Sequence, residues 1–493
     1  SFFRLITIHL ILQMAAEAMG DREAISAGDQ RLTYAQLDHA ARRVASRLQP
    51  GQRLAYLAEN SPVMPAAIFG AALAGTPFVP INYRLAAEQV DALMARVAPA
   101  LLISETAKPY ADIDRISLAD VATGTAMEGE APDEKGGIAI ELFTSGTTGE
   151  PKSAILRHSN LMAYIFGSVE FMSAGEEEAS LVTVPPYHIA GISAVLSSTY
   201  AGRRMVQLPN FSPQGWIDLA QKEAVTHAFV VPTMLQHIVE HVGTNGGTLD
   251  LPNLRALSYG GGKMPLPVIE KAIELLPHVN FTNAYGLTET SSTICLLGPD
   301  AHRDAMASSD AHIRRRLGSV GQALPAIELQ IRSEDGPVCA ADEVGLVYVR
   351  GEQVGGEYKG IGSQLDDEGW FPTKDVGFVD SEGYLFLDGR ADDVIVRGGE
   401  NISPGEVEDV LLGHDGVKEV AVVAVPDQEW GEAVGAAIVC AGIAPGVAEL
   451  CDLVRDKLRS SRVPAKIIFM DELPYNETGK LLRRVVRDQL AGQ

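Results

Sequence analysis

Cysteines are scarce in this sequence, and their positions exclude the common cysteine-based architectures. The 493 residues include Cys295, Cys339, Cys440 and Cys451. None of them lies at the short spacing of a zinc site, and the chain is far longer than a disulfide-stabilised secreted domain. We therefore expect free thiols in a reducing compartment, which favours a cytoplasmic protein.

Long hydrophobic runs are also absent. The most apolar stretch, within residues 1–20, is about a dozen residues long and is interrupted by Arg4 and His9, so it is too short to span a bilayer. A signal peptide is the alternative interpretation. We favour an N-terminal helix with one apolar face, followed by a strand. No transmembrane segment is expected, which leaves only peripheral contact with a membrane open.

Basic residues are outnumbered by acidic ones. Lysine and arginine total 40 against 64 aspartate and glutamate residues, which gives a formal net charge of −24. A chain of this charge repels nucleic acid and anionic membranes at long range, so no nucleic-acid partner is expected. Any anionic small molecule must be held by local hydrogen-bond donors, lysines or a metal ion.

The sequence does contain a regular alternation of helix-like and strand-like segments. Examples are helices over Thr33–Leu48, Pro62–Ala74 and Ala87–Ala98, a strand over Arg53–Glu59 and a turn over Gly75–Leu85. The alternation is typical of α/β layers built on mostly parallel sheets. With 46% hydrophobic and 21% charged residues, the composition predicts a globular protein of about two to four domains.

The most specific feature is the segment Thr144–Lys152, with the sequence TSGTTGEPK, which follows the apolar run 137–143. Glycines let backbone N–H groups converge on an anion, hydroxyls add donors, and lysine adds positive charge. Because Lys152 follows Pro151, the segment does not match the Walker A pattern. We predict a polyphosphate loop. Its candidate ligands are Thr144, Ser145, Gly146, Thr147, Thr148, Gly149 and Lys152.

Five further motifs follow the phosphate loop in a fixed order. They are Asn283–Glu289 (NAYGLTE), Gly369–Asp375 (GWFPTKD), Gly389–Asp393 (GRADD), Gly398–Glu408 (GGENISPGEVE) and Pro474–Lys480 (PYNETGK). In this order they resemble the motifs of adenylate-forming enzymes, the superfamily of acyl-CoA synthetases, firefly luciferase and the adenylation domains of peptide synthetases. The resemblance extends over nearly the whole chain.

The resemblance implies an α/β fold with a large N-terminal adenylation domain of several subdomains and a small mobile C-terminal α/β domain. We place the first domain at residues 1–389, a hinge at 390–392 centred on Asp392, and the C-terminal domain at 393–493. Two half-reactions on one adenylate need two sets of contacts, which a rotation at the hinge would supply.

The resemblance also implies ATP, Mg²⁺ and coenzyme A as the cofactor and co-substrates. It assigns Tyr285 to the adenine, Asp375 and Arg390 to the ribose hydroxyls, and Gly398 to the tunnel for the thiol arm. The full set of implied binding residues outside the phosphate loop is Gly260, Gly261, Gly262, Asn283, Ala284, Tyr285, Gly286, Asp375, Arg390 and Gly398.

Three catalytic roles are implied for the ends of two motifs. Glu289 is the implied Mg²⁺ ligand, since Mg²⁺ is often held by one or two carboxylates together with phosphate oxygens. Thr288 would donate to the α-phosphate. Lys480, on the mobile domain, would bridge the substrate carboxylate and the α-phosphate while charge develops.

Three positions depart from the family pattern. Ser153 and Lys374 stand where relatives usually have glycine, and Lys263 where they more often have proline. We expect Lys374 to neutralise Asp375 in part. These departures keep open a non-catalytic binding protein of the same fold.

The substrate class is inferred from the segment around Tyr187 and His188, which resembles a motif of fatty-acyl and aryl CoA ligases and implies that His188 lies at the pocket mouth. No carboxylate occurs in the pocket segments 188–193, 230–235 and 258–262. We therefore predict a carboxylate–CoA ligase for a hydrophobic fatty, bulky or aryl acid, in fatty-acid or lipid metabolism. The alternative is an acyl-AMP ligase that loads a carrier protein. The chain could be a monomer or a homodimer.

Overall fold

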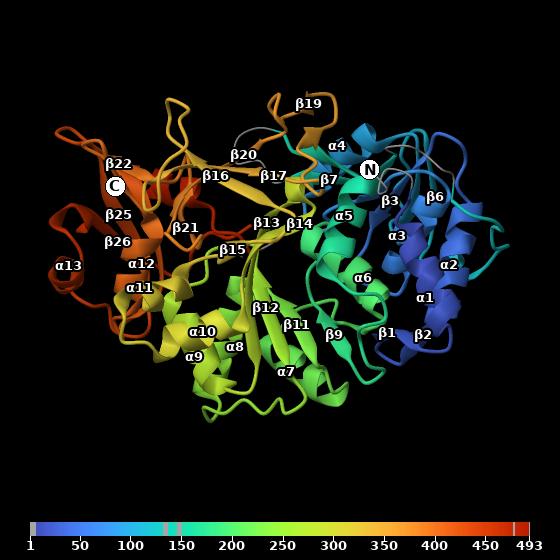
Figure 1. The fold of residues 1–493 in the computed structure, drawn as a ribbon, viewed down its shortest axis with the longest axis horizontal. Coiled ribbons are helices and arrows are strands. Elements are labelled where there is room, and N and C mark those ends of the chain that lie inside the picture. The colour runs from blue at the N-terminus through green and yellow to red at the C-terminus, as the bar shows by residue number, and fades with distance from the viewer. Residues whose placement is uncertain (1–5, 132–136, 145–149, 477–478, 493) are drawn as a thin grey trace.

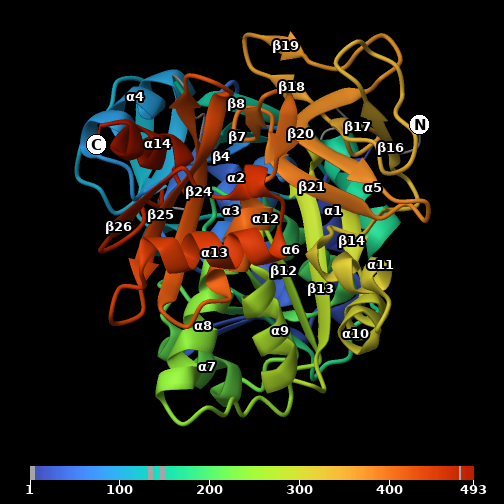
Figure 2. The same cartoon turned by 90° about the vertical axis from the view of Figure 1, so that its left-hand side faces the viewer.

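The computed structural model describes residues 6–131, 137–144, 150–476 and 479–492. Two large sheets carry most of the N-terminal two thirds of the chain, and a smaller antiparallel sheet leads to a separate C-terminal sheet (Figure 1). Figure 2 shows the C-terminal part from its own side, in front of the large sheets. Within the described residues, no helix has both the length and the apolar character needed to cross a membrane.

The first large sheet is parallel in its centre and antiparallel at both ends. Its strands, in spatial order, are β15 (Gln322–Ala323), β14 (Ser292–Leu297), β13 (Asn280–Leu287), β12 (Ala256–Gly260), β11 (His227–Val230), β9 (Ala179–Val182), β10 (Arg204–Gln207), β1 (Glu23–Ala27) and β2 (Gln30–Thr33).

The second large sheet is also parallel in one half. Its order is β19 (Gly362–Ser363), β18 (Glu357–Tyr358), β8 (Lys152–Arg157), β7 (Ile138–Thr144), β4 (Phe78–Pro80), β3 (Arg53–Leu57), β5 (Ala100–Ser104) and β6 (Ile113–Ile116). Every residue of β5 is buried, as expected for a parallel strand covered on both faces.

The remaining strands form two smaller sheets. One is antiparallel, with β16 (Glu328–Arg332), β17 (Gly345–Arg350), β20 (Phe371–Val379) and β21 (Leu385–Arg390). The other contains β22 (Ile395–Arg397), β23 (Glu400–Ile402), β24 (Val417–Asp427), β25 (Gly431–Cys440) and β26 (Lys466–Met470). The second of these sheets has its own cores on both faces, built only from residues 395–490.

Helices cover both faces of the sheets. They are α1 (His9–Met19), α2 (Tyr34–Ser46), α3 (Val63–Leu73), α4 (Ala87–Val97), α5 (His158–Ser168), α6 (Ile189–Ala201), α7 (Pro213–Lys222), α8 (Pro232–Thr244), α9 (Leu266–Leu275), α10 (Pro299–Ala307), α11 (Ala311–Arg314), α12 (Pro404–Leu412), α13 (Val447–Lys457) and α14 (Arg483–Ala491). Side chains of α1, α2, α3, α5 and α6 form one core with strands of both large sheets.

The predicted N-terminal helix is present as α1, and its apolar side chains are buried in that core. The predicted turn over Gly75–Leu85 is wrong in part. Residues 78–80 form the short strand β4, in which Phe78 and Val79 are fully buried and pair with β3. Glycine and proline around so short a strand resemble a turn in sequence, and only its burial between β3 and β7 stabilises it as a strand.

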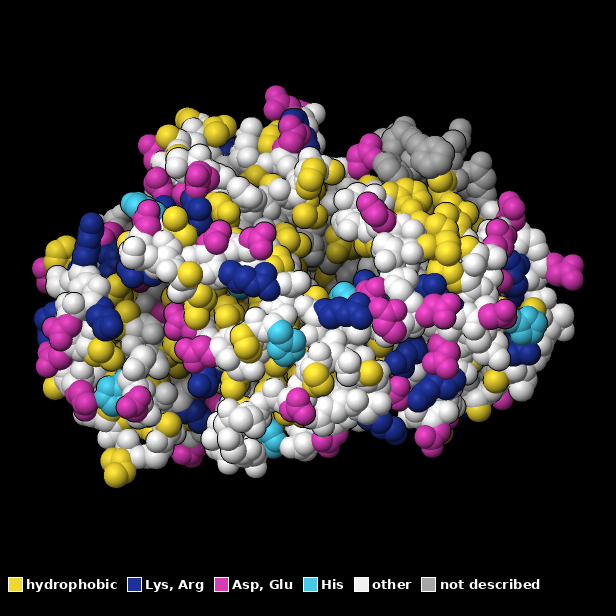
Figure 3. Space-filling view, turned by 60° about the horizontal axis from the view of Figure 1, so that its bottom comes forward, with side chains coloured by type: hydrophobic (Ala, Val, Ile, Leu, Met, Phe, Trp, Pro, Cys, Tyr) yellow, Lys and Arg dark blue, Asp and Glu magenta, His cyan; other side chains and the backbone are white. Residues whose placement is uncertain are grey.

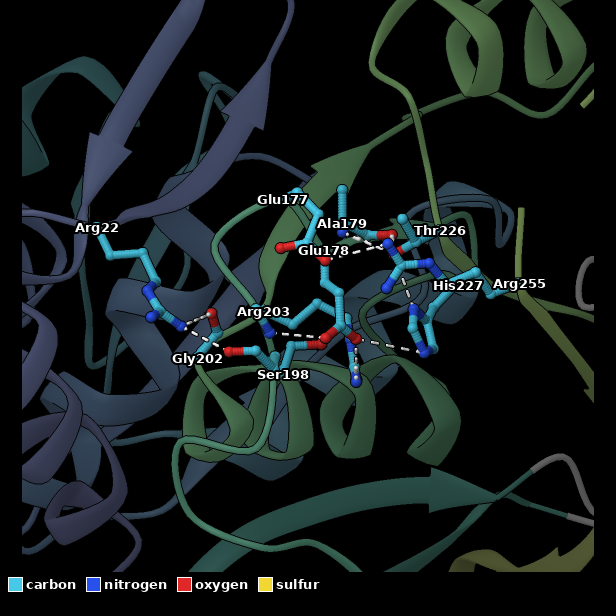
Figure 4. Close-up of polar contacts among 12 residues, drawn as sticks. Arg22, Glu177, Glu178, Ala179, Ser198, Gly202, Arg203, Thr226, His227 and Arg255 are labelled. Carbon is cyan, nitrogen blue, oxygen red and sulfur yellow. Dashed lines mark hydrogen bonds and ion pairs between the residues drawn. The ribbon is translucent and has the colours of Figure 1, made fainter. Parts of the chain in front are cut away.

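A polar network joins the amino ends of β9, β11 and β12 (Figure 4). Glu178 accepts from Arg203 at 3.1 Å and lies 3.6 Å from His227 Nε2, while Arg255 pairs with Glu177 at 3.0 Å. The Thr226 side chain bonds the backbone of Ala179. These contacts fix the strands at one edge of the sheet and leave the opposite, carboxyl edge to other residues.

Candidate active site

The predicted site residues follow the carboxyl ends of neighbouring strands in the first large sheet. His188 comes after β9, Gly260–Gly262 end and follow β12, and Glu289 follows β13. In open parallel sheets, ligands bind at this edge because the loops after the strands converge there. The structure therefore brings together segments that are about 100 residues apart in the chain.

The predicted phosphate loop connects β7 to β8. Thr144 and Lys152 pair across this hairpin, and the Thr144 hydroxyl donates to the Lys152 carbonyl at 3.3 Å. Ser145, Gly146, Thr147, Thr148 and Gly149 lie outside the described residues. The Lys152 ammonium lies 5.3 Å from the centre of the Tyr358 ring, so its charge is held next to an aromatic face.

Tyr358 is a site residue that the sequence did not reveal. Its hydroxyl donates to Glu289 Oε1 at 2.6 Å, and the Gly355 and Gly356 N–H groups donate to the Glu289 carbonyl. Glu289 Oε2 has no hydrogen-bond partner among the described residues. The available sequence signal was one tyrosine in a glycine-rich segment, GGEYKG. The contact fixes the carboxylate that is the candidate metal ligand.

One free carboxylate oxygen fits Mg²⁺ better than a metal that needs a full protein cage. The described residues contain no cluster of three or more histidine, cysteine or acidic side chains that could hold a metal ion. Mg²⁺ keeps several waters and is commonly bound by one or two carboxylates plus substrate phosphates. Glu289 beside the phosphate-loop hairpin matches that donor set.

Asp375, Tyr285 and Arg390 form a polar cluster in which Asp375 and Tyr285 are buried and Arg390 is partly exposed. The Tyr285 hydroxyl donates to Asp375 Oδ2, and Arg390 donates to Oδ1 at 3.1 Å and to the Thr373 carbonyl at 2.7 Å. Burial raises the pKa of Asp375, and Arg390 and Tyr285 oppose that rise. The cluster leaves a carboxylate in place to accept hydroxyl donors.

The expected neutralisation of Asp375 by Lys374 is wrong. Lys374 is exposed while Asp375 is buried, because β20 bulges here: its pairing with β17 shifts between Leu346 and Tyr348, and Lys374 has a left-handed backbone conformation. Lys374 instead lines a small cavity with Tyr348 and Asp392, the centre of the predicted hinge. The cation that pairs with Asp375 is Arg390.

Lys374 also has a positive φ of 64°. At positive φ, a residue with a Cβ destabilises the folded state by about 1 to 2 kcal/mol through steric strain. Glycine avoids this strain, but it destabilises the folded state by about 0.5 to 1 kcal/mol because its unfolded chain has more conformational entropy. We expect Lys374→Gly to raise the free energy of unfolding by about 0.5 to 1 kcal/mol, measured by urea denaturation. Lys418→Gly, at an exposed strand position without positive φ, is the matched control and should destabilise. A loss of stability in Lys374→Gly would contradict the strain.

Lys480 lies among the charged groups of the site, although it belongs to the C-terminal part of the chain. Burial lowers the pKa of its ammonium group, and nearby Arg390 lowers it further. The carboxylates of Asp375, Asp393 and Glu289 act in the opposite direction. The preceding Gly479 packs so closely on Thr233 that a Cβ there would lie 2.7 Å from the threonine hydroxyl. The lysine is therefore brought up to the carboxyl edge of the sheet.

His188 caps helix α6. Its Nδ1 accepts from the Ala190 N–H at 3.1 Å, so the neutral ring carries its proton on Nε2. Burial lowers the pKa of His188 to about 4, and the charge of Lys480 contributes. The other edge of the ring lies near Gly261, where a Cβ would be 3.9 Å from Nε2. The predicted pocket-mouth histidine thus lies between Lys480 and the glycine run.

The predicted site glycines have different local surroundings. A Cβ on Gly260 would lie 2.1 Å from the Ala284 carbonyl oxygen, and one on Gly286 would lie 1.9 Å from the Ser292 carbonyl oxygen. Backbone packing between strands therefore requires both. At Gly262 a Cβ would meet only Pro232, at 3.9 Å. Gly262 is the member of the run that borders open space. Asn283 bonds the Ser319 carbonyl at 3.2 Å.

Gly398 lies in the turn between β22 and β23 of the C-terminal sheet. It has a positive φ of 56°, and a Cβ there would lie 2.6 Å from the Trp430 ring. Trp430 is 41% exposed and stacks under Arg397 at 4.5 Å. No sequence pattern singled out this tryptophan, which comes next to Gly398 only through the pairing of β22 with β25.

The surface carries charges of both signs despite the net negative charge. On the face shown in Figure 3, basic and acidic side chains alternate, and a hollow bordered by hydrophobic side chains opens near the middle.

A cavity of about 630 Å³ lies at the carboxyl ends of β3 and β5 and shares no residue with the predicted site. Its wall residue Tyr83 packs edge-on against Tyr187, beside His188.

Comparisons with known proteins agree with this arrangement. A family model described as AMP-binding enzyme matches residues 12–359, and one described as AMP-binding enzyme C-terminal domain matches residues 406–480. The chain is 32% identical over 479 residues to a 2-succinylbenzoate–CoA ligase of Bacillus cereus, which covers 95% of each chain. It is 31% identical over 499 residues to a fatty acid–[acyl-carrier-protein] ligase of Streptomyces coeruleorubidus, which covers 95% of this chain and 93% of that protein.

A solved structure has the same fold. It is o-succinylbenzoate CoA synthetase from Bacillus subtilis in complex with its acyl-adenylate intermediate, with a TM-score of 0.84 and 29% identity. The match covers 97% of this chain and 98% of that one. Because the first family model spans well over half of the chain and relatives above 30% identity cover nearly all of it, the chain belongs to the AMP-binding enzyme family.

Proposed function

We propose that this protein is an ATP-dependent carboxylate–CoA ligase that forms an acyl-adenylate and then an acyl-CoA thioester. The observation that carries the proposal is the position of Lys480: the preceding Gly479 packs on Thr233 at the carboxyl edge of the large sheet, and the charges of Asp375, Arg390 and Glu289 are near enough to shift the pKa of Lys480. Asp375 is the carboxylate assigned to the ribose, and Glu289 is the carboxylate assigned to Mg²⁺. A lysine near both is positioned to contact the α-phosphate, which would lie between the ribose and the metal ion. The relatives that ligate acids to coenzyme A support the same reaction.

In the first half-reaction, a carboxylate oxygen attacks the α-phosphorus of ATP, and pyrophosphate leaves with the electrons of the broken P–O bond. The two reactants are both anions, so fixed cations must lie between them. We assign this role to Lys480, with Lys152 near the outer phosphates. Mg²⁺, when bound by Glu289, would neutralise further phosphate charge.

Asp375 and Arg390 would hold the ribose in this step. The Asp375 carboxylate is buried and already bonded on both oxygens, so it is fixed in place before a nucleotide arrives. Preorganisation of this kind lowers the ordering cost at the moment of binding. Thr288, at the start of the short helix after β13, is assigned to the α-phosphate.

In the second half-reaction, the thiol sulfur of coenzyme A attacks the acyl carbonyl, loses its proton, and AMP leaves. We propose that residues 1–389 and 393–493 are the two domains and that Asp392, in the hinge 390–392, permits their rotation. Asp392 is exposed, and its carbonyl accepts from Arg487 of α14 at 3.3 Å. Rotation would exchange Lys480 for the Gly398 turn and Trp430.

For the acid, we propose an uncharged bulky or aryl chain. Gly262 borders open space next to α8, and His188 and Gly261 define the neighbouring wall. The relative from Bacillus cereus is named for 2-succinylbenzoate, an aromatic acid, which favours an aryl substrate. The relative from Streptomyces coeruleorubidus is named for a fatty acid, so a long alkyl chain is the alternative. The aromatic ring of the first acid and the alkyl chain of the second are apolar groups that a glycine-lined pocket admits, whereas the second carboxylate of 2-succinylbenzoate has no counterpart in the uncharged acid proposed here.

A carrier-protein acceptor is the second candidate, because the relative from Streptomyces coeruleorubidus loads an acyl carrier protein. A panel of aryl and fatty acids, assayed separately for pyrophosphate release and for CoA thioester, tests the proposal. Thioester formation supports the ligase. If pyrophosphate is released but the thioester forms only on a carrier protein with a phosphopantetheinyl group, the acceptor is that carrier protein and not coenzyme A. Neither product from any acid would favour the non-catalytic binding protein.

Gly262→Leu tests the acid pocket. A leucine should fill the space beside Pro232, and overpacking costs about 1 to 3 kcal/mol, or roughly 5- to 150-fold in kcat/KM for bulky acids. Small acids, where they are used, should be spared, and the KM for ATP should change little. Gly243→Leu, at a helical glycine without neighbours within 4 Å, is the control. A uniform loss over all acids with weaker ATP binding would place Gly262 at the nucleotide instead.

A further inference from the structure

Lys263 joins the glycine run of the N-terminal domain to helix α12 of the C-terminal domain. Its ammonium donates to the Gly405 carbonyl at 2.6 Å and to Asp409 Oδ2 at 2.9 Å. The other oxygen of Asp409 accepts from the Leu266 N–H at 3.2 Å. These partners are more than 140 residues apart in the chain, so the contact is a true domain interface.

The contact is placed where it can control the orientation of the C-terminal domain. Lys263 follows Gly262 directly, and α12 begins 12 residues after the hinge residue Asp392. Figure 2 shows α12 next to the N-terminal domain and α9 below it. Lys480 is carried by the same C-terminal domain, so a restraint on α12 is also a restraint on Lys480.

The charges around Asp409 make Lys263 the cation that holds this interface together. The Asp409 side chain is 19% exposed, and burial raises its pKa while Lys263 lowers it. The carboxylate of Glu408 raises the pKa of Asp409. Asp409 in turn raises the pKa of Glu270 on α9. Without the ammonium group, α12 would face α9 with acidic groups on both sides.

We propose that Lys263 is a positioning residue that latches α12 against the N-terminal domain and thereby holds Lys480 at the adenylation site. The inference rests on the proposed two-step function and adds a specific determinant of its first orientation. The latch has to open before coenzyme A can react, because rotation at Asp392 carries Asp409 and Gly405 away from Lys263.

The test compares Lys263→Ala with Lys271→Ala. Lys271 is on α9, the helix that follows Lys263, and it pairs with Glu274 within that helix. We expect Lys263→Ala to lower the ratio of the adenylation rate to the rate of thioester formation from supplied acyl-adenylate by about two- to fivefold, the scale of a partly exposed ion pair. Lys271→Ala should leave the ratio unchanged, and Lys263→Arg should restore most of it.

Gly405→Ala provides an independent variant in which both charges remain. A Cβ at Gly405 would lie 2.3 Å from Lys263 Nζ, so the lysine has to leave its place. We expect the same fall in the ratio as in Lys263→Ala, and no further fall in the double variant. Equal losses in both half-reactions, or a larger loss in the double variant, would show a general structural defect and overturn the latch.

A readout without catalysis separates this inference from the proposed function. Opening of the interface should speed tryptic cleavage within residues 390–397 by about two- to fivefold in Lys263→Ala relative to Lys271→Ala. Equal cleavage rates would overturn the latch even in an active enzyme. If the wild type released no pyrophosphate with any acid, the proposed function would be wrong, and the cleavage rates would still decide on the interface.

Discussion

Lys480→Ala should lower the rate of acyl-adenylate formation by about 100-fold or more, because it removes a preorganised charge from the point where negative charge gathers. Lys480 is the only lysine whose pKa is shifted by Asp375, Arg390 and Glu289 together in the described residues. The fall should be in kcat more than in the KM for ATP, since the contact matters most in the transition state. Pyrophosphate release under saturating acid and ATP measures it.

The second half-reaction is the internal control for this variant. Thioester formation from supplied acyl-adenylate should remain within a few-fold of wild type, because the proposed rotation at the hinge would carry Lys480 away in that step. Lys457→Ala, an exposed lysine on α13, is the matched substitution. Equal losses in both half-reactions together with a lower melting temperature would indicate a folding defect and remove Lys480 from the chemistry.

Local sequence patterns predicted the elements that carry the site. The helix expected over Thr33–Leu48 is observed as α2 over Tyr34–Ser46, where Thr33 caps the first turn and its capping box is complete. The strand expected before the phosphate loop is β7. Periodicity and caps are properties of a few consecutive residues, so they can be read without knowing the rest of the fold.

Contacts between distant segments could not be predicted in the same way. Tyr358 reaches Glu289 across 69 residues, and Lys263 reaches Asp409 across 146. Both pairs depend on sheet order and domain packing, which no local pattern contains. The error over Lys374 has the opposite origin: adjacency in sequence suggested a contact with Asp375, whereas the bulge in β20 separates the exposed Lys374 from the buried Asp375.

Two buried histidines should make the protein sensitive to mild acid. His158 is 4% exposed and His302 is 2% exposed, and burial lowers the pKa of each to about 4. His158 Nδ1 accepts from the Ile8 N–H at 3.0 Å, so a proton on that nitrogen would break the link between α1 and α5. His302 is held between Tyr259 and the Gly298 carbonyl.

The sign of the effect follows from the lowered pKa of a base. Both histidines stay neutral in the folded protein but take up protons when it unfolds below about pH 6.5, so stability is complete above that pH and is lost as pH falls toward 4. Between pH 7 and pH 5, each histidine should lower the free energy of unfolding by about 2 kcal/mol.

In His158→Asn the amide oxygen can still accept from the Ile8 N–H, yet the side chain does not titrate. Urea denaturation should therefore show a fall smaller by about 2 kcal/mol than in wild type, with His39→Asn as the exposed control. An unchanged fall would mean that the acid sensitivity arises from other groups.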